Sequence, residues 1–239
     1  MASSKAIMMK VQENHVNRFI HPFRMGIVGQ TMAGKSLLIK EIVRFRRQLF
    51  TTEYSAIYYC LPETPFNSGF EKFTRELKTI CPEIRILENL PSPDLLRESE
   101  LPKLFILDDL MEEIFKSNFM PEFFTRGSHH FSNSIIFTSQ NYFNTKKDLT
   151  IMRNLSYKII FHKSGELIYM SSICRQFSRD PNFLEKIFAL LEEEECPNVI
   201  DNRFILFDSH PNVAMRSFPI RAMILPRKDG EIRPLLFKN

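Results

Sequence analysis

The sequence predicts an α/β fold built on a mostly parallel sheet with helices on both faces. Two observations favour it. The strongest apolar runs, such as "LFIL" at 104–107, show no polar alternation, and segments with apolar residues at helical spacing separate them. Strands without alternation are typical of a parallel sheet covered on both faces. With 239 residues, the chain is long enough for one large domain of this kind, whereas two full domains would be cramped.

The first expected strand leads into a glycine-rich turn, "FRMGIVGQTMAGKS" at residues 23–36. Three of the seven glycines in the chain, Gly26, Gly29 and Gly34, fall within nine residues, which indicates a backbone requirement. The segment fits G-x-x-x-x-G-K-[ST], with an apolar run before it and a helical pattern after it. This order of strand, turn and helix start is typical of a phosphate-binding loop, whose backbone N–H groups form a concave anion site.

The loop predicts a site for a nucleoside triphosphate. We expect Lys35 to pair with the β- and γ-phosphates and the Ser36 hydroxyl to ligate Mg²⁺. The ATP-binding residues that follow from the motif are Gly29, Gln30, Thr31, Met32, Ala33, Gly34, Lys35, Ser36 and Leu37. The alternative is an ordinary glycine turn before an amphipathic helix, which the strand and helix context disfavours.

Beyond the loop, the chain reads as alternating helices and strands. The helix expected over 35–50 has an apolar face of Leu37, Leu38, Ile42, Phe45 and Leu49. Next come a strand at 54–61, a helix at 69–80, a short strand at 83–87, and a loop or short helix at 91–99. Later elements are helices at 168–177 and 181–195, then strands within 201–211 and 216–228 that are expected to add antiparallel to a sheet edge.

A second chemical signal is "KLFILDDL" at 103–110, where an apolar run ends in Asp108 and Asp109. In a parallel sheet, the carboxyl end of a strand faces the crevice in which the ligand binds. Asp108 is expected to hold Mg²⁺, directly or through water, as the Walker-B carboxylate, and Asp109 to orient or deprotonate the attacking water. The alternative is an Asp pair that caps the helix expected after it.

A third signal is "NSIIFTSQNYF" at 133–143, a short buried strand that ends in polar residues. If it lies beside the Walker-B strand, Gln140 can point at the γ-phosphate or at the attacking water. The nearby "TKKD" at 145–148 matches a guanine-reading pattern of GTPases. It is displaced from the end of its strand, however, and "DDLM" lacks the glycine of the switch motif, so a GTPase is disfavoured.

These segments together resemble a known family, the viral DNA-packaging ATPases of the FtsK/HerA superfamily. The resemblance rests on "GQTMAGKSLLIKEI", "LFILDDLM", "FTRGSHHFSNSIIFTSQNYF" and "RNLSYKIIFH", in this order, and covers roughly residues 23–207. It is closest to the ATPases of Polinton or Maverick elements and more distant from those of poxviruses. It implies a RecA-like core that forms a ring, a pentamer or hexamer, hydrolyses ATP between subunits and pumps double-stranded DNA into a preformed capsid.

The resemblance also implies roles for individual residues. Lys35 and Ser36 match the phosphate and Mg²⁺ positions, Asp108 and Asp109 the Walker-B pair, and Gln140 the sensor. The second acid of that pair is often Glu in the family, and Asp109 has a shorter reach. A ring ATPase needs an arginine delivered in trans, for which Arg126 is the first candidate and Arg153 the second. His129 and His130 either face DNA or hold their loop.

Composition and charge add expectations about partners and location. Residues 1–50 carry nine Lys or Arg against two acids, and the last stretch is also basic. Such clustering suits a phosphate-backbone partner, but a charged stripe of this kind is more often a solvated helix face. The four cysteines lie far apart, so neither a zinc site nor a disulfide framework is indicated. With no signal peptide and no apolar run near the ~20 residues that span a bilayer, we expect an intracellular protein without membrane contact. The resemblance implies, in addition, a location at the assembly site in an infected host cell.

The expected organisation is one compact domain. It comprises an N-terminal segment at 1–22, a P-loop ATPase core at 23–207 and a basic C-terminal strand extension at 208–239. A capsid or portal protein is a further expected partner. Two other functions remain open: a P-loop nucleotide kinase, which would need an acceptor site and an arginine-rich lid, and a nucleotide-dependent scaffold without significant turnover.

Overall fold

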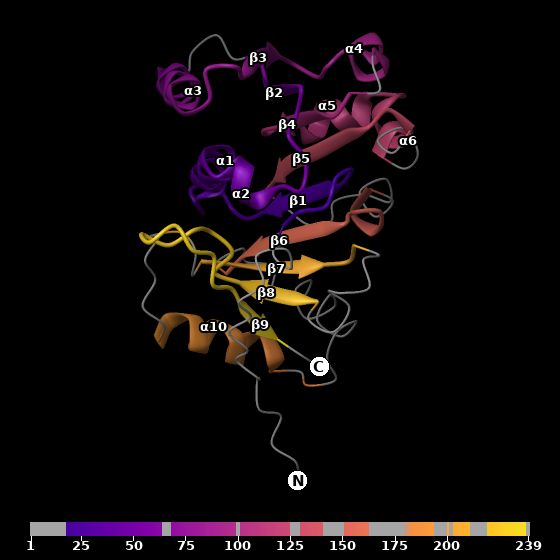
Figure 1. The fold of residues 1–239 in the computed structure, drawn as a ribbon. Helices are drawn as coiled ribbons and strands as arrows, with labels where there is room; N and C mark the ends of the chain where they lie inside the picture. Colours follow the sequence, from indigo (N-terminus) through magenta and orange to yellow (C-terminus); the bar gives the residue numbers. More distant parts are fainter. Residues whose placement is uncertain are drawn as a thin grey trace.

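The computed structural model describes residues 18–63, 68–98, 101–124, 130–140, 151–162, 180, 182–193, 200, 203–210 and 219–237. Within these residues, one nine-stranded sheet has the order β3-β2-β4-β5-β1-β6-β7-β8-β9 (Figure 1). The strands are β1 (Arg24–Val28), β2 (Ala56–Leu61), β3 (Arg85–Glu88), β4 (Lys103–Leu107), β5 (Asn133–Ser139), β6 (Tyr157–Phe161), β7 (Phe204–Asp208), β8 (Ile220–Ala222) and β9 (Leu235–Phe237). The helices are α1 (Lys35–Arg44), α2 (Arg46–Leu49), α3 (Ser68–Ile80), α4 (Pro93–Arg97), α5 (Met111–Lys116), α6 (Met120–Glu122) and α10 (Phe183–Glu193).

The first six strands of the sheet run parallel, from β3 to β6, and the last three pair antiparallel. The predicted class is therefore confirmed: an α/β fold with a mostly parallel sheet flanked by helices and with added C-terminal strands. Two of the added strands, β7 and β8, lie within the expected segments, whereas β9 was not expected. The order also places β5 between the P-loop strand β1 and the Walker-B strand β4.

Hydrophobic clusters lie on both faces of the sheet. On β4, Leu104 and Ile106 belong to the cluster that includes α1 and α3, whereas Phe105 and Leu107 belong to the cluster that includes α5, α6 and α10. All four side chains are at most 1% exposed. Since successive side chains of a strand point to opposite faces, burial on both faces explains why this run has no polar alternation.

The helix expected over 35–50 is interrupted, and its buried face differs from the prediction. α1 ends at Arg44, and α2 begins at Arg46, whose guanidinium donates to the Val43 carbonyl (3.1 Å) and pairs with Glu83 (2.6 Å). The first contact gives a carbonyl at the end of α1 a hydrogen-bond donor, and the second joins the turn between the helices to the residue Glu83, before β3. The buried residues of α1 are Leu38, Ile39, Ile42 and Val43. Leu37 was expected in this face but is 38% exposed.

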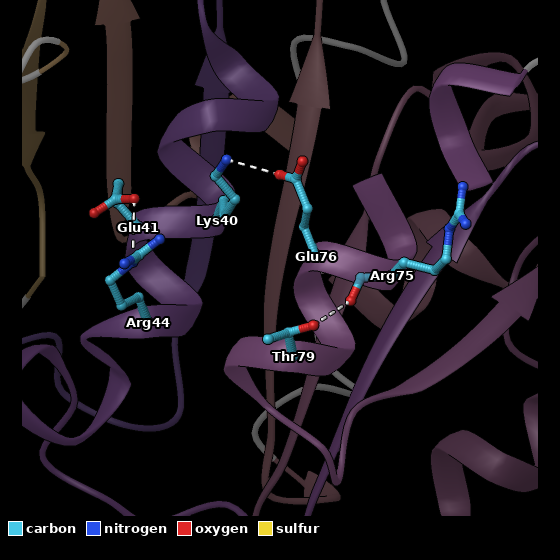
Figure 2. A network of polar contacts seen from close by, with 6 residues as sticks. All are labelled: Lys40, Glu41, Arg44, Arg75, Glu76 and Thr79. Carbon is cyan, nitrogen blue, oxygen red and sulfur yellow. Dashed lines mark hydrogen bonds and ion pairs between the residues drawn. The ribbon is translucent and has the colours of Figure 1, made fainter. Parts of the chain in front are cut away.

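An ion pair joins α1 to α3 on the face of the sheet that both helices cover. Lys40 Nζ lies 2.9 Å from Glu76 Oε2, as Figure 2 shows. Arg44 pairs with Glu41 one turn earlier on α1 (3.3 Å). Both pairs are partly exposed, so each contributes little to stability.

Several charged side chains are buried where β6, β7 and β8 meet. Arg221, only 1% exposed, forms an ion pair with Asp208. Nearby, Lys158 Nζ donates to the Ser209 hydroxyl (3.0 Å) and to the Leu155 carbonyl (3.3 Å). Burial lowers the pKa of Lys158 to about 8, although the Asp208 carboxylate raises it in part. Keeping this ammonium charged is therefore costly for the folded state.

We expect Lys158→Met to stabilise the protein at pH 7. The pKa of Lys158 is lower in the folded chain than in the unfolded chain, so below about pH 8 folding must bury the charged form. The cost is at most about 3 kcal/mol, and it disappears as Lys158 deprotonates between pH 8 and its ordinary pKa of 10.5. The advantage of the variant in urea unfolding should thus shrink as pH rises through this window.

The control for this prediction is Lys116→Met on α5, where the lysine is exposed and, within the described ranges, forms an ion pair with Glu112 alone. It should change stability by less than about 0.5 kcal/mol and show no trend between pH 7 and 10. A Lys158→Met variant whose difference from wild type is the same at pH 7 and pH 10 would contradict the proposed cost.

Among the residues that the structure describes, no helix is both long and apolar enough to cross a membrane. In the same ranges, Cys60 and Cys81 are buried free thiols, and no three His, Cys, Asp or Glu side chains form a metal-binding group. Cys174 and Cys196 lie outside the described residues.

Candidate nucleotide-binding site

The loop between β1 and α1 has the backbone shape that its sequence predicts. Gly34, directly before α1, has φ +110°, a conformation that L side chains rarely adopt. At Gly29, an added Cβ would lie 3.0 Å from Phe161 Cβ and 3.1 Å from Ala33 Cβ, so close packing requires glycine there. Met32 also has positive φ (+66°), and its side chain is 96% exposed at the tip of the loop.

Gly26, like Gly29 and unlike Gly34, is explained by close packing and not by a positive φ. It lies within β1 and is not among the residues with positive φ. An added Cβ would lie 2.7 Å from Leu155 Cδ1 and 3.1 Å from Phe137 Cζ. A larger residue at this position would require the Leu155 and Phe137 side chains to shift.

The start of α1 supplies the positive part of the site. No described side chain caps this helix end, and its first turn contains no acidic residue, so the end of the helix dipole is available to an anion. Lys35 Nζ donates to the Gly29 and Gln30 carbonyls (2.6 and 3.0 Å) and so lies across the loop. Burial lowers the pKa of Lys35, and the carboxylates of Asp108 and Asp109 raise it in part.

Asp108 is held rigidly at the end of β4. Its side chain is 4% exposed. Oδ1 accepts a hydrogen bond from the Thr138 hydroxyl (2.7 Å), and Oδ2 accepts one from the Tyr59 hydroxyl (2.5 Å). The Ser36 hydroxyl is 3.5 Å from the same Oδ2. Side chains from β2, β5 and α1 therefore converge on one carboxylate.

Tyr59 and Thr138 have positions that the sequence analysis did not identify. Thr138 Oγ1 also accepts a hydrogen bond from the Asp109 backbone N–H (2.9 Å), so this one hydroxyl contacts both Asp108 and Asp109. The available signal was a tyrosine inside a buried strand, because a buried phenol needs a hydrogen-bond partner. The sequence alone could not show that the partner is Asp108, which lies on a neighbouring strand.

We expect Tyr59→Phe to raise the Mg²⁺ concentration that half-saturates nucleotide binding by about 10-fold. Partners that orient a metal-binding carboxylate typically contribute this much to metal affinity. The measurement is calorimetric titration with ATP at a series of Mg²⁺ concentrations.

Tyr58→Phe is the matched control. Tyr58 is the preceding residue of β2, is also buried, and accepts a hydrogen bond from Arg85 (2.9 Å) on the opposite face of the sheet. Equal Mg²⁺ requirements in the two variants would show that the Tyr59 hydroxyl does not orient Asp108 for the metal.

The predicted catalytic residues Asp109 and Gln140 line the same cleft. Asp109 follows Asp108 with φ +58°, a conformation that Asp tolerates better than most residues, and its side chain is exposed. The cleft has a volume of about 460 Å³. Its lining comprises Thr31, Met32, Gly34, Lys35, Ser36, Leu37, Phe70, Asp108, Asp109, Thr138 and Gln140. Phe70, from α3, is a lining residue that the sequence did not indicate.

The chemistry of the donor set fits Mg²⁺. Ser36 and Asp108 offer a hydroxyl and a carboxylate oxygen 3.5 Å apart, and Mg²⁺ prefers such oxygen ligands, usually from one or two side chains together with substrate phosphates. When bound, the ion would neutralise charge on the phosphates. Among the described lining residues, the one cation, Lys35, and the two carboxylates match a triphosphate that arrives with a divalent metal.

Other predicted residues lie elsewhere. Gln30 and Ala33 line a neighbouring cleft rather than this one. Arg153 is exposed and precedes β6, which runs parallel to β1, so it lies toward the opposite edge of the sheet from the loop. Arg126, His129 and the "TKKD" segment lie outside the described residues, whereas His130 is exposed just before β5.

Comparisons with known proteins give likeness in fold only. No protein-family model matches the chain, and no curated protein matches it. The genome packaging NTPase B204 of Sulfolobus turreted icosahedral virus 2, solved with ATP-γS, is 13% identical with a TM-score of 0.40, covering 78% of this chain and 92% of that one. EccC (ATPases 2 and 3) of Thermomonospora curvata, solved with a signal sequence peptide, is 11% identical with a TM-score of 0.41, covering 91% of this chain and 37% of that one. No residue role is transferred from either.

Proposed function

We propose that this protein is an ATP-hydrolysing motor that moves double-stranded DNA into a viral capsid. The observation that carries the proposal is the convergence of the P-loop, the Asp108–Asp109 pair and Gln140 on one cleft, at the carboxyl ends of three parallel strands. Such a cleft is where open α/β sheets bind their ligands. The DNA and capsid parts of the proposal rest on the sequence resemblance.

The described residues suggest how hydrolysis proceeds. The N-terminus of α1 and the Lys35 ammonium hold the triphosphate by electrostatic attraction. Asp109, exposed in the cleft beside Gln140, orients or deprotonates the attacking water, and Gln140 contacts that water or the γ-phosphate. A neighbouring copy in the ring supplies an arginine that neutralises the negative charge developing on the γ-phosphate in the transition state. Arg126 of that copy is the first candidate and Arg153 the second.

The N-terminal basic residues support DNA binding only in part. Lys40, Arg44 and Arg46 each form an ion pair with an acidic residue of the same chain, so they do not form an unbroken basic face. Arg47 is exposed on α2 and remains a candidate for contact with phosphate groups. The proposed setting, an assembly site in an infected cell with a capsid or portal protein as partner, follows from the resemblance as well.

Steady-state ATP hydrolysis with and without duplex DNA tests the proposal. A DNA-translocating motor should turn over several-fold faster with duplex DNA, and the stimulation should fall steeply between 50 and 200 mM salt because DNA binding releases counterions. Sedimentation in the presence of ATP and DNA should show a ring-sized oligomer.

Two other outcomes would favour the alternatives. Phosphate transfer to a nucleoside monophosphate, with hydrolysis indifferent to DNA, would indicate a nucleotide kinase. Tight ATP binding with no significant turnover under any condition would indicate a scaffold or switch, for which Asp109 would be a poor base. Either result would leave the nucleotide site in place and overturn the motor.

A further inference from the structure

A second cleft adjoins the phosphate cleft on the other side of the P-loop. Its volume is about 440 Å³, and it shares Thr31 and Met32 with the first cleft. The phosphate cleft extends towards the carboxyl ends of β4 and β5. The second cleft extends towards the last residue of β6 and the residue just before β7. Its lining comprises Gln30, Thr31, Met32, Ala33, Phe161, His162, Glu192 and Arg203.

One wall of the second cleft is an aromatic platform. The His162 imidazole, directly after β6, stacks on Phe188 of α10 with ring centroids 3.9 Å apart and planes at 14°. His162 lines the cleft and Phe188 does not, so the imidazole lies between Phe188 and the open space. The His162 backbone N–H donates to the Arg203 carbonyl (2.8 Å), which fixes the platform to the residue before β7. A flat ring held in this way is a good stacking surface for a planar heterocycle.

The polar groups of the second cleft are complementary to the edge of such a ring. The Arg203 guanidinium offers only hydrogen-bond donors, and the Glu192 carboxylate offers only acceptors. Both side chains are exposed at the cleft, and neither forms an ion pair with another residue of the described ranges. The exposed thioether of Met32 adds apolar surface at the loop tip that the two clefts share.

We propose that the second cleft binds the purine base and ribose of the nucleotide whose phosphates occupy the first cleft. His162 stacks on the base, and Arg203 and Glu192 donate to and accept from the polar groups of the base edge and the sugar. The nucleotide then crosses the loop at residues 31–32, with its γ-phosphate towards Asp109 and its base towards α10. This inference rests on the proposed nucleotide site and assigns its specificity to residues from the C-terminal part of the chain.

The test compares Mg²⁺-dependent binding of ATP, GTP, CTP and inorganic tripolyphosphate by calorimetry. Wild type should bind ATP or GTP at least about 10-fold more tightly than tripolyphosphate, because stacking of one base contributes this much. His162→Ala should weaken purine nucleotide binding by about 10-fold and leave tripolyphosphate binding unchanged. His162→Phe keeps an aromatic ring at this position and should retain purine nucleotide binding. That result would show that the alanine variant loses affinity because the ring is missing.

Glu192→Gln should lower purine nucleotide affinity several-fold, because it removes a charged acceptor. The matched control is Glu193→Gln, an adjacent exposed acid of α10 outside the cleft lining, which should bind as wild type does. Equal affinity of wild type for ATP and tripolyphosphate, or unchanged ATP binding in His162→Ala, would overturn the second cleft as the base site while the phosphate site stands. Failure of wild type to bind either ligand would instead overturn the proposed function.

Discussion

Lys35→Met is expected to reduce kcat/KM for ATP hydrolysis by about 100-fold or more, the usual loss when one preorganised charge at a transferring phosphoryl group is removed. Its effect on stability should be small. The ammonium is half-buried, burial lowers its pKa, and its described hydrogen-bond partners are two loop carbonyls. Methionine keeps most of the packing without the cost of burying a charge, so the free energy of unfolding should stay within about 1 kcal/mol of wild type.

Lys40→Met provides the comparison on the same helix. Lys40 pairs with Glu76 of α3 and does not line the phosphate cleft, so this change should have little effect on stability and leave hydrolysis unchanged. Both variants can be measured in parallel by urea unfolding and phosphate release. Turnover within threefold of wild type in Lys35→Met would contradict the assignment of this lysine to the phosphates.

Asp108→Asn and Asp109→Asn are expected to have different effects on stability although both impair hydrolysis. Asp108 is buried and accepts hydrogen bonds from Tyr59 and Thr138 on its two oxygens. The nitrogen of an asparagine side chain cannot accept a hydrogen bond, so one of these hydroxyls would lose its acceptor. We expect a loss of about 1–3 kcal/mol in unfolding free energy, together with at least a 100-fold loss in Mg²⁺-dependent turnover.

Asp109→Asn should leave the stability within about 0.5 kcal/mol, because the side chain is exposed and asparagine readily adopts the positive φ of this position. Turnover should nevertheless fall by roughly 100-fold or more, the range for loss of a general base. Normal turnover in this variant would transfer the water-orienting role to Gln140. Unchanged stability in Asp108→Asn would show that the hydrogen bonds around its carboxylate are not required for folding.

The sequence predicted the parts of the fold whose backbone conformation or burial depends on residues that are adjacent in the chain. The P-loop is recognisable because Gly34 needs a positive φ and Lys35 and Ser36 follow it at once. Strand β4 is recognisable because both faces of the sheet bury its side chains. These are local requirements, and they leave a local pattern in the sequence.

The missed features depend on contacts between distant segments. Tyr59 binds Asp108 only because β2 pairs with β4 in a register that also joins the Asp108 N–H to the Cys60 carbonyl (2.9 Å). The break between α1 and α2 coincides with a contact between Arg46 and Glu83, which lie far apart in the sequence. Strand β9 has three residues, and its one partner among the described strands is β8, at the edge of the sheet.

The position of β5 between β1 and β4 has a consequence for folding during synthesis. β1 carries the loop and β4 carries the carboxylates, but β1 pairs only with β5 and β6 among the described strands. A growing chain that has not yet produced residues 133–139 has no strand to join the two halves of the site. Long-range pairing of this kind forms slowly and late, so ATP cannot stabilise the nascent N-terminal half. That half must remain free of aggregation on its own or with the help of a chaperone until β5 has been synthesised.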